Sequence, residues 1–401
     1  MVSQFISPPR LRLHDRESER QATWLELFYD LVFAVAVSVI GVSLFDQPTV
    51  LGLLQAVALF VPIWWAWVGH TIYNTRFDTD DLFHRLLTFG IMLAAAGMAI
   101  TVPYAFKGGA GSFAATYIAA RVCLFILYGR AYHHVSEARP IIKLYLGGFG
   151  LGDSLWLLSI FTSAPWCYVL WLIGILISFA TPWIGIAMLK KAPVDTSHVP
   201  VRFASFTIIM LGEIIAVTVG QVAGQALQSS STLAVFLSFG IAACIWWLYF
   251  TFLDLAPVRD SLSSGQPFIY VHLPLVCGLL LLRIGLEKAT VEARHTLLML
   301  STRWLLILGM TLWSLAGLVL KMVVVRRLPN WRIFIRLGFL AAIILLFGFG
   351  GAIFSPLLVL ILFLCIMLLY SSHEGLLLMR EAQRKERVRE EESGQQRSGA
   401  I

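Results

Sequence analysis

Apolar runs of about 20 residues recur along almost the whole chain, separated by short stretches where charged residues, Gly, Pro and Asn gather. A bilayer core about 30 Å thick is crossed by roughly 20 helical residues, so most of these runs are long enough to span a membrane. The runs lack the alternation of apolar and polar positions that is typical of the strands of a membrane β-barrel. The pattern therefore predicts an all-α integral membrane protein.

Breaking the chain at the polar stretches predicts about 12 transmembrane helices. The first six are expected at about 24 to 45, 50 to 71, 84 to 105, 112 to 132, 141 to 162 and 165 to 189. The other six are expected at about 201 to 223, 231 to 253, 268 to 287, 300 to 322, 332 to 352 and 354 to 373. Residues 1–23 form a polar cytoplasmic arm without the apolar core of a cleavable signal peptide. Residues 374–401 form a charged cytoplasmic tail, part of which is predicted to be a short solvated helix.

Composition points to lipid as the surroundings of this chain. Of the 401 residues, 58% are hydrophobic and 13% are charged, and the mean hydropathy is +0.80. Soluble domains carry roughly 25% charged residues, so about half of the usual water-facing charge is missing. These values exclude an ordinary soluble protein of this size and make the lipid bilayer the first predicted partner.

The distribution of Lys and Arg predicts the orientation of the chain. With the N-terminus placed in the cytoplasm, 24 of the 30 Lys and Arg residues fall on the cytoplasmic side and five on the outer side. This bias follows the positive-inside rule and predicts a multi-pass protein of the inner (plasma) membrane with both termini cytoplasmic. Anionic lipid at the cytoplasmic surface then explains the net charge of +7, and no nucleic-acid partner is predicted.

An internal duplication relates the two halves of the chain. At offsets of 182 and then 188 residues, Val32–Val37 overlays Ile214–Val219, Trp64-Trp65 overlays Trp246-Trp247, and His84, Gly90 and Gly97 overlay His272, Gly278 and Gly285. The Trp pair followed by a His-Gly-Gly series in one order favours two six-helix repeats, at 24–190 and 201–373, joined by a cytoplasmic linker at 191–200. Because six is an even number, the repeats are parallel, and ion or substrate sites are expected at their interface.

Five ionisable residues lie deep inside predicted spans: Glu26, Asp30, Arg121, Asp153 and Glu213. Each costs roughly 2.5 to 3.5 kcal/mol in lipid on insertion scales, so each needs a partner, a cavity or a function. One interpretation is that these groups line a polar pathway for an ion, a proton or a charged head group. The alternative is a structural ion pair of Arg121 with Asp153 or Glu213, which would only fix how the helices pack.

Glu26 allows a further alternative because it lies about one turn from the cytoplasmic end of the first span. Its carboxylate can reach water, or it can bond to Arg20 or Arg202.

Secondary candidates lie at the cytoplasmic starts of the third helix of each half. Asp78, Asp80 and Asp81 form an acidic loop that is able to attract a hard cation but lacks the rest of a calcium loop, so N-capping of the following helix is favoured. His84 and His272 occupy matching positions, as interfacial histidines or as functional groups. No metal site, cofactor or catalytic arrangement is predicted, which does not favour an enzyme.

Several stretches resemble the bacterial low temperature requirement protein A family. They are Glu26–Phe33, Trp64–Asp81, Arg202–Glu213, His272–Leu275 and Gly285–Lys288. The resemblance implies a multi-pass membrane protein linked by name to growth in the cold. A fainter similarity connects Phe28, Asp30, Val32, Phe33 and Ala34 to the potassium channels with a Phe-Ser-x-x-Asp signature, which also use six-helix units, although here Tyr29 stands in place of Ser.

The leading functional hypothesis is transport or permeation of a small ion or solute through the interface of the two repeats. One alternative is a membrane-embedded enzyme or lipid-handling protein that uses the acidic loop and His84. Another is a structural or sensory scaffold involved in cold adaptation.

Overall fold

The structure is a computed structural model that describes residues 7–12, 22–189, 192–195, 198–223, 229–253, 265–324 and 329–398. In these ranges the chain is almost entirely helical, and only two residues at each of two places form a strand. The parts of the predicted linker at 190–191 and 196–197 lie outside the described residues.

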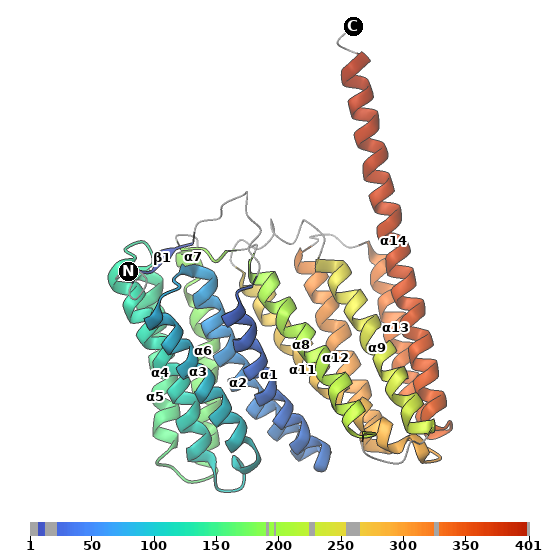
Figure 1. Ribbon diagram of the computed structural model, residues 1–401, viewed down its shortest axis with the longest axis horizontal. Coiled ribbons are helices and arrows are strands. Elements are labelled where there is room, and N and C mark those ends of the chain that lie inside the picture. The colour runs from blue at the N-terminus through green and yellow to red at the C-terminus, as the bar shows by residue number, and fades with distance from the viewer. Residues whose placement is uncertain are drawn as a thin grey trace.

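The first group of helices covers the first half of the chain (Figure 1). It consists of α1 (Trp24–Asp46), α2 (Val50–Arg76), α3 (Leu82–Thr101) with the 3-10 turn η2 (Val102–Tyr104), α4 (Ala110–His134), α5 (Arg139–Ser159) and α6 (Trp166–Ile184). The short helix α7 (Ile186–Leu189) follows it.

The second group lies beside the first. It consists of α8 (His198–Gly220), α9 (Ser229–Leu253), α11 (Gln266–Val291) with η3 (Glu292–Arg294), α12 (Leu300–Val324), α13 (Asn330–Gly348) with η4 (Gly350–Ala352), and α14 (Pro356–Ser398).

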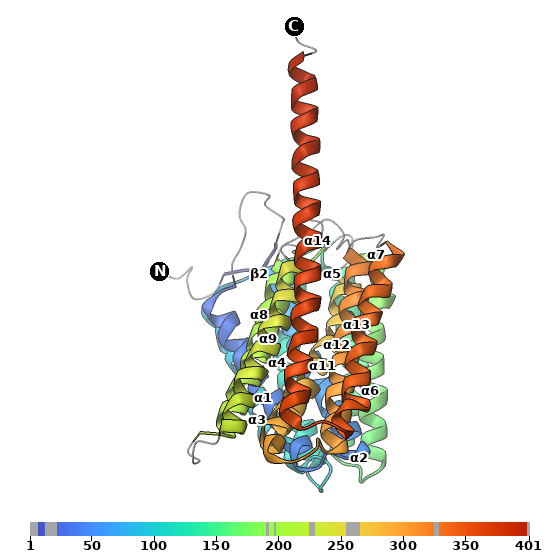
Figure 2. The ribbon, with the colours of Figure 1, turned by 90° about the vertical axis from the view of Figure 1, so that its right-hand side faces the viewer.

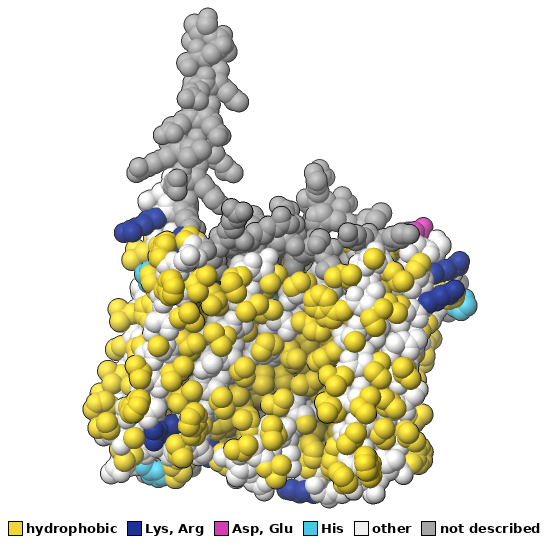
Figure 3. All heavy atoms as spheres, turned by 180° about the vertical axis from the view of Figure 1, so that it is seen from behind, with side chains coloured by type: hydrophobic (Ala, Val, Ile, Leu, Met, Phe, Trp, Pro, Cys, Tyr) yellow, Lys and Arg dark blue, Asp and Glu magenta, His cyan; other side chains and the backbone are white. Residues whose placement is uncertain are grey.

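The predicted spans are confirmed: the described residues contain 12 helices that are long and apolar enough to cross a membrane. Their outer surface is hydrophobic, and in Figure 3 the Lys and Arg side chains appear at the upper and lower margins of that surface. A helical bundle that exposes apolar side chains around its middle is suited to contact with the lipid hydrocarbon of a membrane.

The last helix differs from its prediction. The charged tail is helical, but it is continuous with the final span, so that α14 runs for 43 residues. Its C-terminal part extends beyond the bundle at the end where α1 and α8 begin (Figures 1 and 2).

The second helix also differs, because α2 continues to Arg76, five residues beyond the predicted end of the span. Next to it the N-terminal arm forms strand β1 (Arg10–Leu11), which pairs antiparallel with β2 (Phe77–Asp78). This short pairing was not predicted. It covers the end of α2 and removes polar backbone groups of that end from water.

The start of α1 is fixed by a capping box. The side chain of Thr23 accepts from the backbone N–H of Glu26, and the Glu26 carboxylate accepts from the backbone N–H of Thr23. Two of the otherwise unpaired amides of the first turn are satisfied in this way, which orients Glu26 at the end of the helix.

Equivalent helices pack in equivalent ways in the two groups. The first helix contacts the second and the third in each group, α1 with α2 and α3, and α8 with α9 and α11. The groups meet where α1 contacts α8 and α11, and this contact surface is called the seam below.

The seam is closely packed where α1 carries Gly41. A Cβ atom at that position would lie 2.0 Å from Nη1 of Arg283 on α11. Glycine leaves room for the guanidinium there, and a larger side chain would require the end of the Arg283 side chain to move.

Candidate functional site

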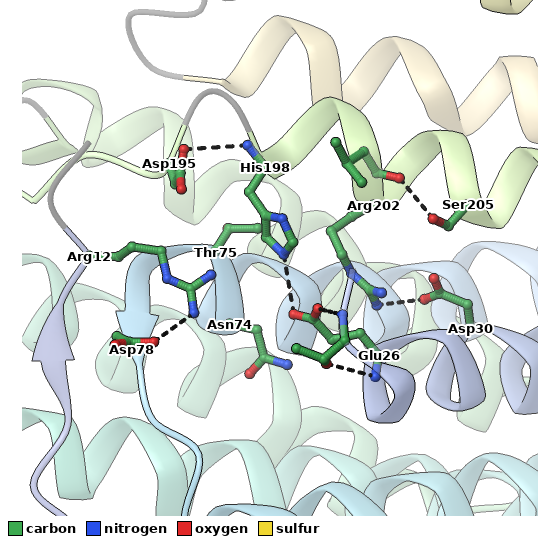
Figure 4. A network of polar contacts seen from close by, with 12 residues as sticks. Arg12, Glu26, Asp30, Asn74, Thr75, Asp78, Asp195, His198, Arg202 and Ser205 are labelled. Atoms are coloured by element: carbon green, nitrogen blue, oxygen red, sulfur yellow. Dashed lines mark hydrogen bonds and ion pairs between the residues drawn. The ribbon is translucent and has the colours of Figure 1, made fainter. Parts of the chain in front are cut away.

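Ionisable and polar side chains bridge the seam at the end where α1 and α8 begin (Figure 4). We call this group the near cluster; it consists of Glu26, Asp30, Trp67, His198 and Arg202. Nη2 of Arg202 donates to Oδ1 of Asp30 at 2.6 Å, and Nε1 of Trp67 donates to the same oxygen at 2.8 Å. The side chains of Asp30 and Arg202 are 0% exposed, so this pair is enclosed by protein.

The second contact of the near cluster joins the first turns of α1 and α8. Nε2 of His198 lies 3.3 Å from Oε1 of Glu26, and both side chains are buried. Residues four apart share one face of a helix, so Glu26 and Asp30 on α1 meet His198 and Arg202, also four apart, on α8. The near cluster is therefore two matched pairs across one helix contact.

A second group, the far cluster, lies toward the other end of the seam and consists of Glu213, Gln221, Arg283 and Glu287. Nε of Arg283 lies 4.0 Å from Oε2 of Glu213, and Nη1 lies 3.7 Å from Oε2 of Glu287. Gln221 donates to Glu287 at 2.9 Å, and Arg283 donates to Ser38 of α1 at 3.3 Å. Of these contacts, that of Arg283 with Ser38 crosses the seam to α1, and the others lie within the second group.

The remaining predicted pair lies away from the seam. Nε of Arg121 on α4 donates to both oxygens of Asp153 on α5, at 3.1 and 3.0 Å, and both side chains are buried. The structure therefore brings Glu26 and Asp30 into one cluster and places Glu213 in another. Arg121 and Asp153 are paired with each other inside the first group of helices.

The acidic loop before α3 is engaged by arginines. Asp78 contacts Arg12 at 3.0 Å, Asp80 contacts Arg85 at 2.8 Å, and Asp81 contacts Arg130 at 2.5 Å. The favoured N-cap is present, because the Asp81 side chain accepts from the backbone N–H of His84. Within the described ranges, no three His, Cys, Asp or Glu side chains are grouped to hold a metal ion.

These contacts also set the acidity of the cap. Burial alone would raise the pKa of Asp81, but hydrogen bonds from Arg130 and from the backbone of His84 and Ser7 lower this pKa from 3.8 to about 2. Hydrogen bonds to the charged form of a carboxylate stabilise that form, so Asp81 stays ionised.

The two matched histidines make equivalent contacts. His84 on α3 bonds to Oδ1 of Asn74 on α2 at 3.0 Å, and His272 on α11 bonds to the hydroxyl of Tyr249 on α9 at 2.9 Å. In each half the third helix is thus tied through its histidine to the second helix. A packing role accounts for both contacts.

Six residues of the two clusters are not among the predicted site residues: Trp67, His198, Arg202, Gln221, Arg283 and Glu287. Arg202 and Arg283 count as loop cations in the charge pattern, yet both are buried within helices. The spacing of four residues between His198 and Arg202, and between Arg283 and Glu287, is a signal that each pair shares a helix face. Which helix that face meets cannot be read from the sequence.

The helices and their apolar surface define the class: this is a multi-pass α-helical membrane protein. The chain belongs to the bacterial low temperature requirement A protein (LtrA) family, whose model matches residues 21–371. It is also similar to the uncharacterized protein RA0937 of Rhizobium meliloti (strain 1021), with 29% identity over 289 residues that cover 68% of this chain and 70% of that protein. A bacterial protein of this class resides in the plasma membrane.

Proposed function

We propose that this protein moves a small ion or solute across the membrane, along the seam between two parallel six-helix repeats. The observation that carries the proposal is that polar contacts cross the seam at both ends, from Arg202 to Asp30 in the near cluster and from Arg283 of the far cluster to Ser38. Charged groups at membrane depth are costly and mark ion or substrate pathways when they are not needed for packing alone.

The proposed repeats comprise residues 24–190 and 201–373, with the linker between them and with both termini in the cytoplasm. The equivalent packing of α1 with α2 and α3, and of α8 with α9 and α11, supports this division. The contact of Glu26 with His198 supports a parallel arrangement, because it joins the first turns of α1 and α8. Parallel repeats commonly carry their transport site at the shared interface.

The near and far clusters act as closures of the path in this proposal. The near cluster is made of contacts that cross between the proposed repeats, so it must separate when the repeats move apart at that end. In the far cluster, the contact of Arg283 with Ser38 is the one that crosses to α1. Glu26, Asp30 and Glu213 are the acidic groups that an ion or a proton would meet on the way. Arg121 and Asp153 support the first repeat beside that path.

The experiment is a flux assay on purified protein in liposomes, with a panel of small cations, anions and protons. We expect flux above that of protein-free liposomes, and we expect Asp30→Asn to change it several-fold because the near closure is weakened. Glu137→Gln, on the exposed turn between α4 and α5, is the matched control and should leave the flux unchanged. Folded protein that passes none of the panel would contradict transport and favour a scaffold.

A further inference from the structure

Arg76 is a buried cation for which no ion pair is found among the described residues. It is the last residue of α2, its side chain is 0% exposed, and none of its three guanidinium nitrogens has a hydrogen-bond partner among the described residues. Its Cζ lies over the ring of Tyr145 on α5, 5.4 Å from the ring centroid. Burial of an unpaired charge costs several kcal/mol, so this arrangement calls for an acceptor.

Arg121 is a second cation with unused donors in the same interior. Its Nε is bonded to Asp153, but Nη1 and Nη2 have no hydrogen-bond partner in the described part of the chain. A Cβ atom at Gly69 of α2 would lie 3.2 Å from Nη1, so α2 approaches the guanidinium closely. The unused amino groups of Arg121 therefore lie between α4 and α2.

The two guanidinium groups lie over two neighbouring rings of α5. Arg76 lies over Tyr145, and Cζ of Arg121 lies 4.8 Å from the centroid of the Phe149 ring. Tyr145 and Phe149 are one helical turn apart on α5, and their rings stack with centroids 4.9 Å apart. Asp153 neutralises one of the two cations, which leaves an excess of one positive charge and at least five unused N–H-bearing nitrogens.

We propose that α2, α4 and α5 enclose a binding site for a small monovalent anion between Arg76 and Arg121. A guanidinium fork matches a planar oxyanion such as nitrate or a carboxylate, and a halide can accept from the same donors. The site has one excess positive charge, which one monovalent anion would neutralise. Because the donors are enclosed, the anion must be small enough to enter without its full hydration shell.

The end of α2 is the side from which the anion would enter. There the backbone N–H of Arg12 donates to the carbonyl of Arg76, and that of Asp195 donates to the carbonyl of Thr75. The N-terminal arm and the segment before α8 thus cover the site at the end where the near cluster lies. The site is separate from the seam and does not depend on transport through it.

The test measures the melting temperature of purified protein in detergent, in gluconate buffer at constant ionic strength, against added chloride, nitrate or acetate. A ligand at about 100 times its Kd should raise the melting temperature by a few degrees and then saturate. We expect this in the wild type and a loss of it in Arg76→Gln. In gluconate alone Arg76→Gln should melt at or above the wild type, because an unpaired charge has been removed. Comparing the three anions separates a halide site from an oxyanion site.

Arg85→Gln is the matched control, since Arg85 makes an exposed ion pair with Asp80 close by in the sequence, and it should keep the wild-type anion response. A wild type without a saturable response, or an Arg76→Gln variant with the full response, would overturn the proposal. If Arg76→Gln does not fold, crystals of the wild type grown in bromide decide the matter by anomalous scattering. A bromide ion touching either guanidinium supports the site, and bromide found only elsewhere rejects it.

Discussion

At the near end of the seam, Arg202 and Asp30 are 2.6 Å apart and both side chains are 0% exposed. At the far end, Arg283 and Glu213 are 4.0 Å apart and the Glu213 side chain is 20% exposed. The near pair also receives an indole N–H from Trp67, whereas no hydrogen bond to Glu213 is found among the described residues. At the near end a short ion pair thus joins the two groups of helices, whereas at the far end the ion pair is longer and lies between α8 and α11 of the second group.

This difference indicates which end of the seam is closed in this conformation. An ion pair that is short, enclosed by protein and held by an additional hydrogen bond favours one fixed geometry, because separating it leaves unpaired charges buried in the protein. The longer pair separates at a lower cost, because its charges interact more weakly at 4.0 Å. In the proposed transport cycle, the far end would therefore open more easily than the near end.

The largest effect should come from Asp30→Asn, which removes the carboxylate that Arg202 contacts. The guanidinium would remain buried without a counter-charge, and breaking a buried pair in this way costs about 3 to 5 kcal/mol. Chemical unfolding in detergent micelles measures this loss. The double variant Asp30→Asn/Arg202→Met should lose less, because both charges are gone. A double variant as unstable as the single one would show that the unpaired guanidinium is not the cause of the loss.

A smaller effect is expected from Trp67→Phe, which removes the indole N–H that donates to Asp30. A hydrogen bond to a charged group contributes about 1.5 to 3 kcal/mol, and the free energy of unfolding should fall by a similar amount. Trp166→Phe is the control, because Trp166 is exposed at the start of α6. Equal losses in the two variants would show that the bond to Asp30 is not what stabilises the near cluster.

Acid should weaken the fold through Asp81 at the start of α3, whose pKa is lowered from 3.8 to about 2 in the fold. The ionised form is favoured by folding, so its contribution is complete above about pH 4 and is lost as the pH falls toward 2. Melting temperatures between about pH 5 and 2.5 should decline less steeply in Asp81→Asn, which keeps an oxygen for the helix cap. An unchanged slope in that variant would assign the acid sensitivity to other groups.

The smallest effect is expected from Glu213→Gln in the far cluster. We expect the loose ion pair at 4.0 Å to contribute about 0.2 to 1 kcal/mol, so the variant should unfold almost like the wild type. The same detergent unfolding assay gives the comparison directly. A loss as large as that of Asp30→Asn would remove the distinction between the two ends.

The sequence predicted the helices well because the thickness of the hydrocarbon core sets the length of a spanning helix, and each apolar run has about that length. It also predicted the N-cap at Asp81, which depends on local spacing alone. The end of α2 was placed too early, since Asn74 and Arg76 suggest a loop. In the structure both are buried within α2, where Asn74 meets His84 and Arg76 meets Tyr145.

The clusters were harder to predict because their partners are distant in the chain. Arg202 and Asp30 are separated by 172 residues, and so are His198 and Glu26. Counting charges by side of the membrane treats a buried Arg202 like a loop cation. Only the packing of α1 against α8 shows that its charge is used inside the protein.

The continuous α14 helix has a mechanical consequence. At 1.5 Å per residue, its 43 residues form a rod about 65 Å long that is anchored in the bundle at one end. For a rod of this length, a tilt of the anchored part by about 3° would displace the free end by about 3 Å. A spectroscopic label near Ser398 would therefore move further than the last span itself. Its displacement would make small rotations of that span within the membrane measurable.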